Sequence, residues 1–225
     1  MDNRLAHIDA WVFDLDNTLY PASTNLFAQI DVRIKGFIAR TLSLSPDEAF
    51  TLQKKYYHEH GTSLRGLMMH HGVEPDEFLD YVHDIDHSVL PANPALEAAL
   101  ARLPGRKFVY TNGSTYHAEQ TLKSLGIDRH FAEIFDIKAS RYIPKPDPGA
   151  FAEFIAQHVI APERAAMFED LPRNLKPAVD LGMTAVWVRH PETQLLPGED
   201  TGHCHYVTDD LPAWLGDAGK TLSGL

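Results

Sequence analysis

The sequence has no long apolar run, almost no cysteine and few basic residues. No uninterrupted apolar run exceeds four residues, whereas a membrane-spanning helix needs about 20, so we expect no transmembrane segment. Residues 1–7 contain no apolar stretch typical of a signal peptide. The one cysteine, Cys204, excludes a disulfide within the chain and is typical of a reducing compartment. These absences predict a cytoplasmic protein without a membrane partner.

Basic residues are also scarce relative to acidic ones. The chain has 20 Lys and Arg against 31 Asp and Glu, a formal net charge of −11 at pH 7. A nucleic-acid polymer or an anionic membrane needs a net positive surface, so neither is an expected partner. A small anionic ligand held by a few local donors is compatible with this charge. Nothing in the sequence specifies an oligomeric state.

Apolar residues make up 44% of the 225 residues, which is the usual share for a globular protein. Several short apolar runs precede turn-forming residues, as is typical of strands buried on both faces. These runs are Ala10–Phe13, Phe108–Tyr110, Ala165–Phe168 and Ala185–Val188, with an edge strand expected at His205–Thr208. Helical patterns between the later runs cover Thr115–Leu125, Pro148–His158 and Arg173–Leu181. This alternation predicts an α/β fold, a Rossmann-like parallel sheet with helices on both faces.

The segment from about Pro21 to Leu90 has helical patterns and no convincing buried strand. Asn25–Leu42 carries apolar residues at helical spacing, and Ser45–Glu48 supplies an N-cap, a first-turn proline and a capping glutamate. Further helices are expected at Ser63–His71 and Pro75–Ile85. We therefore predict an all-helical cap at residues 21–91, inserted into a Rossmann-like core made of residues 1–20 and 92–225.

Acidic residues directly follow two of the expected strands. Asp14 and Asp16 come after the first strand, and Glu169 and Asp170 come after the strand at 165–168. Open α/β sheets bind ligands at the carboxyl ends of their strands, where neighbouring carboxylates are costly unless a cation or a proton offsets them. Carboxylates on loops suit Mg²⁺. Each motif alone would equally fit acids at a helix N-terminus.

Two further motifs could hold an anion. Thr111, Asn112 and Gly113 follow a strand and open a helical pattern, so a hydroxyl, an amide and backbone N–H groups form a possible anion cradle. Lys145 lies among three prolines on a stiff loop, which suits a point-charge contact with a phosphate oxygen. A capped helix without a ligand and a solvated lysine are the alternative interpretations.

The order and spacing of these motifs resemble the four-motif signature of the haloacid dehalogenase-like hydrolase superfamily. The matching positions, in motif order, are Asp14/Asp16/Thr18, Thr111, Lys145 and Asp170. The helical insert resembles the cap of the type I members. The resemblance implies Mg²⁺-dependent hydrolysis of a small-molecule phosphate monoester through an aspartyl-phosphate.

The same resemblance implies a role for each residue. Asp14 would be the nucleophile and Asp16 the general acid and base. Mg²⁺ would bind the side chains of Asp14 and Asp170 and the backbone carbonyl of Asp16. The phosphoryl oxygens would be held by Thr111, Asn112, Gly113 and Lys145, and the supporting residues behind the metal and the nucleophile would be Thr18, Glu169 and Asn174. Asn174 replaces an acid found in many members and would reach the metal through water or bond Asp170.

Three segments resemble the pyrimidine 5′-nucleotidase branch: Asp14–Tyr20, His60–Leu67 and Phe168–Asp170. UMP or CMP is then the expected substrate, with sugar phosphates, phosphoglycolate and pyridoxal phosphate as alternatives. A 2-haloacid dehalogenase needs neither the second acid nor a metal, and a non-catalytic phosphate-binding regulator usually lacks a catalytic acid, so both are less favoured. Cap residues that could contact the leaving group are Tyr20, Thr62, Ser63, Arg65 and His70.

Histidines suggest zinc at two places, and the sequence disfavours both. His83 and His87 lie four apart on an expected helix but lack the glutamate of a zinc-protease helix. In His203-Cys204-His205, an extended backbone would send Cys204 to the opposite face.

Overall fold

A single parallel sheet organises the chain in the computed structural model, which describes residues 3–191, 195 and 198–223. Within these residues the sheet has six strands in the order β3-β2-β1-β4-β5-β6, and every neighbouring pair is parallel. The strands are β1 (Ala10–Phe13), β2 (Arg106–Tyr110), β3 (Glu133–Phe135), β4 (Ala165–Glu169), β5 (Thr184–Val188) and β6 (Tyr206–Thr208). The predicted α/β, Rossmann-like class is confirmed.

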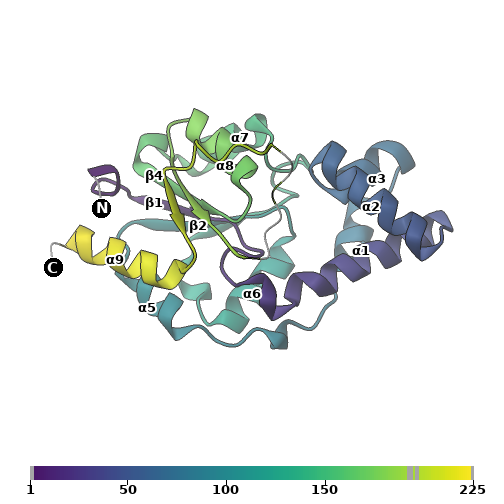
Figure 1. Ribbon diagram of the computed structural model, residues 1–225, viewed down its shortest axis with the longest axis horizontal. Helices are drawn as coiled ribbons and strands as arrows, with labels where there is room; N and C mark the ends of the chain where they lie inside the picture. Colours follow the sequence, from purple (N-terminus) through teal and green to yellow (C-terminus); the bar gives the residue numbers. More distant parts are fainter. Residues whose placement is uncertain (1–2, 192–194, 196–197, 224–225) are drawn as a thin grey trace.

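Helices cover both faces of this sheet (Figure 1). Trp11 and Phe13 point to one face, and the alternate residues Ala10 and Val12 point to the other. The first face packs against α5 (Pro94–Arg102), α6 (Thr115–Leu125) and α9 (Leu211–Ser223). The second face packs against α7 (Pro148–His158) and α8 (Pro172–Asp180). Burial on both sides explains why the strands are continuously apolar.

The strand order reverses direction between β1 and β4, which are neighbours in the sheet although about 150 residues separate them. Phe13 pairs with Phe168, and the Asp14 backbone N–H donates to the Phe168 carbonyl at 2.9 Å. The acids that follow the two strands therefore emerge side by side at a topological switch point, where sheets of this kind bind ligands.

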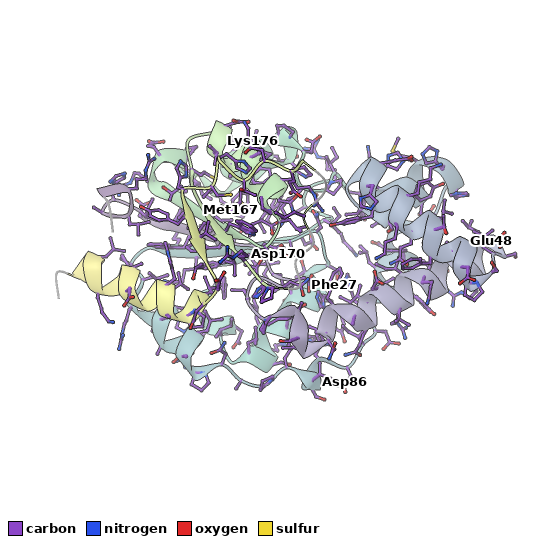
Figure 2. The ribbon with its side chains drawn as sticks, in the orientation of Figure 1. Phe27, Glu48, Asp86, Met167, Asp170 and Lys176 are labelled. Atoms are coloured by element: carbon purple, nitrogen blue, oxygen red, sulfur yellow. The ribbon has the colours of Figure 1, made fainter. Side chains whose placement is uncertain are left out.

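Four helices between β1 and α5 pack around an apolar cluster to which the core adds Ile137. They are α1 (Leu26–Leu42), α2 (Pro46–His60), α3 (Ser63–His71) and α4 (Pro75–Val82). Gly66 lets α3 approach α2 closely, because a Cβ there would lie 2.3 Å from the Tyr56 ring. Figure 2 places Phe27 and Asp170 on the two sides of the boundary with the sheet, and Glu48 at the far end of the helices. The predicted limits of the cap, residues 21–91, stay a prediction.

One predicted helix is too long. The pattern at Pro75–Ile85 predicts three more residues than α4 has. At the end of this helix Arg33 Nε donates to the Tyr81 carbonyl at 2.5 Å. His83 and His87 thus lie beyond the helix, on the segment that leads back to the sheet.

No helix within the described ranges is long and apolar enough to cross a membrane.

Candidate active site

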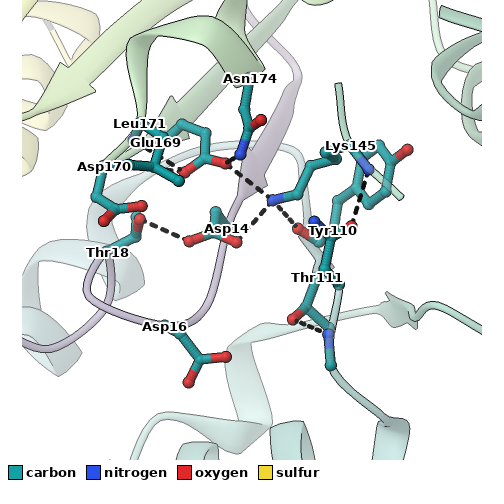
Figure 3. Close-up of polar contacts among 12 residues, drawn as sticks. Asp14, Asp16, Thr18, Tyr110, Thr111, Lys145, Glu169, Asp170, Leu171 and Asn174 are labelled. Atoms are coloured by element: carbon teal, nitrogen blue, oxygen red, sulfur yellow. Dashed lines mark hydrogen bonds and ion pairs between the residues drawn. The ribbon is translucent and has the colours of Figure 1, made fainter. Parts of the chain in front are cut away.

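The Asp14 carboxylate occupies the carboxyl end of β1 and accepts a hydrogen bond on each oxygen (Figure 3). The Thr18 hydroxyl donates to Oδ2 at 2.8 Å, and Lys145 Nζ donates to Oδ1 at 2.6 Å. Thr18 reaches back because the chain turns at Asn17, whose φ is +58°. The side chain of Asp14 is nearly buried and is held at the floor of a cavity.

Lys145 is a buried cation with three partners inside the protein. Its Nζ donates to Asp14 Oδ1, to the Tyr110 carbonyl at 2.9 Å and to Glu169 Oε1 at 3.2 Å. Burial would lower the pKa of Lys145, but Asp14 and Glu169 raise that pKa above its ordinary value. Because an ammonium has three donors, these contacts use all of them. The structure places Lys145 on the nucleophile, and the expected contact with a phosphate oxygen stays a prediction.

Glu169, the last residue of β4, is buried and contacts Lys145, Asn174 and its neighbour Asp170. Its Oε1 also accepts a hydrogen bond from the Asn174 side-chain amide, and its Oε2 accepts one from the Asp170 backbone N–H at 2.8 Å. Asn174 was expected to reach the metal through water or to bond Asp170. In the structure its side chain instead bonds Glu169. The Asp170 backbone carbonyl is held by the Trp187 indole at 3.0 Å, which fixes the loop that carries Asp170.

Three buried carboxylates meet at this point. Oxygens of Asp14, Glu169 and Asp170 all lie within 4.8 Å of one another. One ammonium, that of Lys145, lies against them, so the group carries an excess of negative charge in a buried place, which is costly without a further cation or protons. Two donors bond each oxygen of Glu169, which uses its acceptor positions, whereas Asp14 accepts one hydrogen bond on each oxygen. Asp14 and Asp170 are therefore the side chains that fit a hard divalent cation such as Mg²⁺.

The ionisation of these acids reflects that excess charge. Burial and the Glu169 carboxylate raise the pKa of Asp14 from 3.8 to about 7, against the opposing effect of Lys145. Burial and Glu169 also raise the pKa of Asp170. For Glu169, burial alone would raise the pKa, but Lys145 and the hydrogen-bond donors hold it below its ordinary value. The surroundings thus favour the ionised form of Glu169 and oppose the ionised forms of Asp14 and Asp170.

Asp16 belongs to a different set of contacts. Its Oδ1 accepts hydrogen bonds from the Tyr20 hydroxyl and from His117 Nε2, the latter at 2.8 Å. Burial would raise the pKa of Asp16, but His117 and Tyr20 hold that pKa below its ordinary value. The two acids of the first motif thus differ in surroundings. In the protein alone, Asp14 more readily holds a proton than Asp16.

The second motif forms a compact turn after β2. Thr111 Oγ1 accepts a hydrogen bond from the Gly113 backbone N–H at 2.9 Å, and Asn112 Oδ1 accepts one from the Lys145 backbone N–H at 2.9 Å. Among the residues that the structure describes, the Thr111 hydroxyl donates no hydrogen bond, so its hydrogen can point at a ligand, whereas the Gly113 N–H already donates to Thr111 Oγ1. Asn112 ties the second motif to the loop of the third.

A cavity of about 480 Å³ lies between the sheet and the helices α1–α4. The residues predicted to act on phosphate all line it, namely Asp14, Asp16, Thr111, Asn112, Gly113, Lys145 and Asp170, together with Glu169 and Asn174. Thr18 is not among the lining residues and reaches the site through Asp14. Of the cap residues expected to contact a leaving group, Thr62 and Ser63 line the cavity, Tyr20 bonds Asp16, and Arg65 and His70 lie outside the lining.

Two residues at the site escaped sequence-based prediction. Gln53 lines the cavity from α2, and its Nε2 donates to Asp31 Oδ1 at 2.8 Å, which turns its Oε1 away from that acid. Within the described part of the chain, no donor reaches this buried Oε1. His117 lies 101 residues from Asp16 in the sequence. No local signal marks either residue, because each faces its partner only after α2 and α6 have packed.

Comparisons with known proteins identify one family and several similar proteins. Residues 8–182 match the family described as haloacid dehalogenase-like hydrolase. Phosphate metabolism protein 8 of Saccharomyces cerevisiae is 31% identical over 189 residues, covering 76% of this chain but 58% of that protein, less than two thirds of its length. Glyceraldehyde 3-phosphate phosphatase of Methanopyrus kandleri is 27% identical over 96% of this chain and 95% of its own. The crystal structure of CbbY from Rhodobacter sphaeroides in complex with phosphate has a TM-score of 0.67 at 18% identity and covers 94% of this chain and 98% of its own.

Proposed function

The chain belongs to the haloacid dehalogenase-like hydrolases, and from that premise we propose that it is a Mg²⁺-dependent phosphate monoester hydrolase that works through an aspartyl-phosphate at Asp14. One observation carries the proposal: four segments that are far apart in the sequence bring Asp14, Asp16, Thr111, Lys145 and Asp170 to the wall of one cavity. The relative that is matched over nearly its full length is named a phosphatase.

The chemistry proceeds in two steps. An Asp14 oxygen attacks phosphorus, the bond to the leaving oxygen breaks, and that oxygen takes a proton from Asp16. Water then attacks phosphorus, the bond to Asp14 breaks, and Asp16 takes the water's proton. The negative charge of a bound phosphate raises the pKa of Asp16 from its depressed value, toward the protonated form that the first step needs.

The remaining side chains prepare the nucleophile. Lys145 and Thr18 hold its two oxygens, so the carboxylate keeps one orientation. Asp14 and Asp170 would hold Mg²⁺ with the backbone carbonyl of Asp16. The ion would keep Asp14 ionised and offset the repulsion between this carboxylate and an anionic substrate. The Thr111 hydroxyl, which lines the same cavity, would donate to a phosphoryl oxygen.

For the substrate we propose a pyrimidine 5′-nucleotide such as UMP or CMP. The cavity is within the range of about 300–1,000 Å³ that encloses small-molecule ligands, and its cap wall is largely apolar, with Phe27, Ile30 and Phe78. Gln53 adds a buried acceptor to that wall. A nucleobase offers both an apolar face and an N–H donor, which phosphoglycolate and a triose phosphate lack.

A substrate panel tests the proposal. Initial rates would be measured with UMP, CMP, AMP, GMP, glyceraldehyde 3-phosphate, phosphoglycolate, pyridoxal phosphate and a 2-haloacid, with Mg²⁺ and with EDTA. We expect phosphate release from UMP and CMP with Mg²⁺, none with EDTA and none from the Asp14→Asn variant. In Gln53→Met, kcat/KM should fall for the nucleotides and not for phosphoglycolate. Preference for a compact phosphate would refute the nucleotide assignment alone, and halide release without phosphatase activity would refute both.

A further inference from the structure

Both protein contacts of the Asp16 carboxylate fall on one of its two oxygens. The Tyr20 hydroxyl and His117 Nε2 both donate to Oδ1, and no residue in the described ranges hydrogen-bonds Oδ2. Figure 3 shows this carboxylate set apart from the residues around Lys145. Two donors on one oxygen fix the rotation of a carboxylate about its last bond and hold its negative charge on that oxygen. Oδ2 is therefore the oxygen that is left to exchange a proton with a ligand.

His117 is itself held on several sides. It is fully buried on α6, and its Nδ1 lies 3.0 Å from His87 Nε2. The His83 ring stacks on it in parallel at 4.7 Å, and the Ser114 hydroxyl bonds His83 Nδ1 at 2.9 Å. With one ring nitrogen bonded to His87 and one ring face covered by His83, the imidazole has a single orientation, with Nε2 toward Asp16. His83 and His87, which the sequence suggests as weak zinc candidates, thus both contact His117 and hold its ring.

These contacts come from the two connections between the sheet and the cap helices. Tyr20 lies on the outgoing connection after β1, and His83 and His87 lie on the returning connection between α4 and α5. His117 joins them from α6, beside the second motif. The His117 side chain thus makes two hydrogen bonds, one with His87 and one with Asp16, which lines the cavity. Since His117 is fully buried and does not line the cavity, it acts on a ligand through Asp16.

We propose that His117, together with Tyr20, is a positioning residue that turns Oδ2 of Asp16 toward the leaving-group oxygen. This inference rests on the proposed function, since it concerns the proton that Asp16 gives to the leaving group. His83 and His87 align the His117 ring for that task. Without the alignment, the Asp16 carboxylate rotates and the proton is delivered less often, although Asp14 still attacks phosphorus.

Two substrates that differ in the basicity of the leaving group distinguish a positioning role of His117 from a purely structural one. p-Nitrophenolate leaves without a proton, whereas phenolate, almost the same size, is far more basic and depends on an acid. We therefore compare kcat/KM for p-nitrophenyl phosphate and phenyl phosphate with Mg²⁺. In His117→Phe, which keeps a ring and removes the donor, the loss on phenyl phosphate should exceed the loss on p-nitrophenyl phosphate by at least about tenfold, out of the roughly 10²–10⁴-fold that acid–base catalysis supplies.

Further variants make the test independent of folding problems. Tyr20→Phe removes the other donor and should show the same selective loss, and His117→Gln, which can place an amide N–H near the original Nε2, should restore most of the phenyl phosphate activity. His158→Phe is the matched control: this buried histidine also faces a carboxylate, that of Glu133 at 3.1 Å, but lies at the end of α7 outside the cavity. It should alter the ratio of the two rates by less than about twofold, because acid catalysis is untouched.

Equal losses on both esters in His117→Phe and Tyr20→Phe would overturn the positioning role and leave the phosphatase proposal standing. The same holds if neither variant loses activity. A wild-type protein that hydrolyses neither ester would overturn both. A selective loss that His117→Gln restores would support both.

Discussion

Replacing Asp14 by asparagine should abolish turnover and, without divalent cations, make the folded protein more stable at pH 8. The carboxylate is buried beside Glu169 and Asp170, and Lys145 is already shared with Glu169. An amide keeps the shape and an acceptor for Lys145 but carries no charge. Without a divalent cation, the ionised Asp14 side chain would therefore lower the stability of the folded protein.

The magnitude follows from the shift in the pKa of Asp14. Its pKa is 3.8 in the unfolded chain and about 7 in the folded protein, a difference of about 3 pH units, which corresponds to about 4 kcal/mol at 1.36 kcal/mol per unit. Because the folded value is raised, the contribution to stability is fully present below pH 3.8 and is lost as the pH rises through 7. We expect a gain of about 2 kcal/mol or more for Asp14→Asn at pH 8, since one amide oxygen cannot replace both carboxylate oxygens.

Urea unfolding in EDTA between pH 5 and pH 8 measures this gain. The stability difference between Asp14→Asn and wild type should grow with pH up to about 7 and then level off. Saturating Mg²⁺ should reduce the difference or reverse its sign, because the cation binds the wild-type site and stabilises it.

A second buried aspartate provides the control. Asp136 accepts hydrogen bonds from Thr115, Lys138 and Ala139, including two backbone N–H groups at its Oδ1. Asp136→Asn should lower stability across the whole pH range, because it loses acceptors without relieving a charge conflict. If Asp14→Asn were destabilising at pH 8 as well, or if its effect did not change with pH, Lys145 would fully neutralise Asp14 and the account of an unbalanced acidic site would be refuted.

Three other predictions concern proton transfer, the metal and the cap. Asp16→Asn should still bind inorganic phosphate by calorimetry, while kcat falls by about 10²–10⁴-fold; unchanged turnover would exclude Asp16 as the acid. Asp170→Asn should raise the Mg²⁺ concentration for half-maximal activity by about tenfold or more, and an unaltered Mg²⁺ titration would remove Asp170 from the metal site. Gly66→Ala should lower the free energy of unfolding by about 1–3 kcal/mol, because the new Cβ would meet the Tyr56 ring. The control Gly216→Ala, on α9 with open space around it, should not lower it. Equal effects of the two substitutions would contradict the close packing of α2 and α3.

The strands and helices that the sequence predicts well are those with strong local signals. The helix bounds of Thr115–Leu125 and Pro148–His158 are confirmed because Ser114 and Asp147 cap them through side-chain hydrogen bonds. β3 was not predicted, since it has three residues and buries only the last of them. The helix α5 was also missed. Pro91 and Pro94 lie close together and hid its start, yet Pro94 is the first residue of the helix and Asn93 caps it.

The site could be predicted where it depends on the sheet and not where it depends on packing between helices. Asp14 and Asp170 follow β1 and β4, which are parallel neighbours in the sheet, so the two carboxylates come close together because of the strand order. The inward turn of Glu169 depends on Asn174 and Lys145 meeting behind it. Only the folded chain brings His117 to Asp16.

The most direct test of the central claim is to look for phosphate on Asp14 itself. The protein would be mixed with Mg²⁺ and UMP or p-nitrophenyl phosphate, quenched in acid within its first turnover, and its peptides analysed by mass spectrometry after borohydride reduction of any acyl phosphate. We predict that residue 14 is converted to homoserine and that the Asp14→Asn variant gives no such product. Phosphate release at the normal rate with residue 14 unmodified at every quench time, or with modification at another residue, would contradict the account.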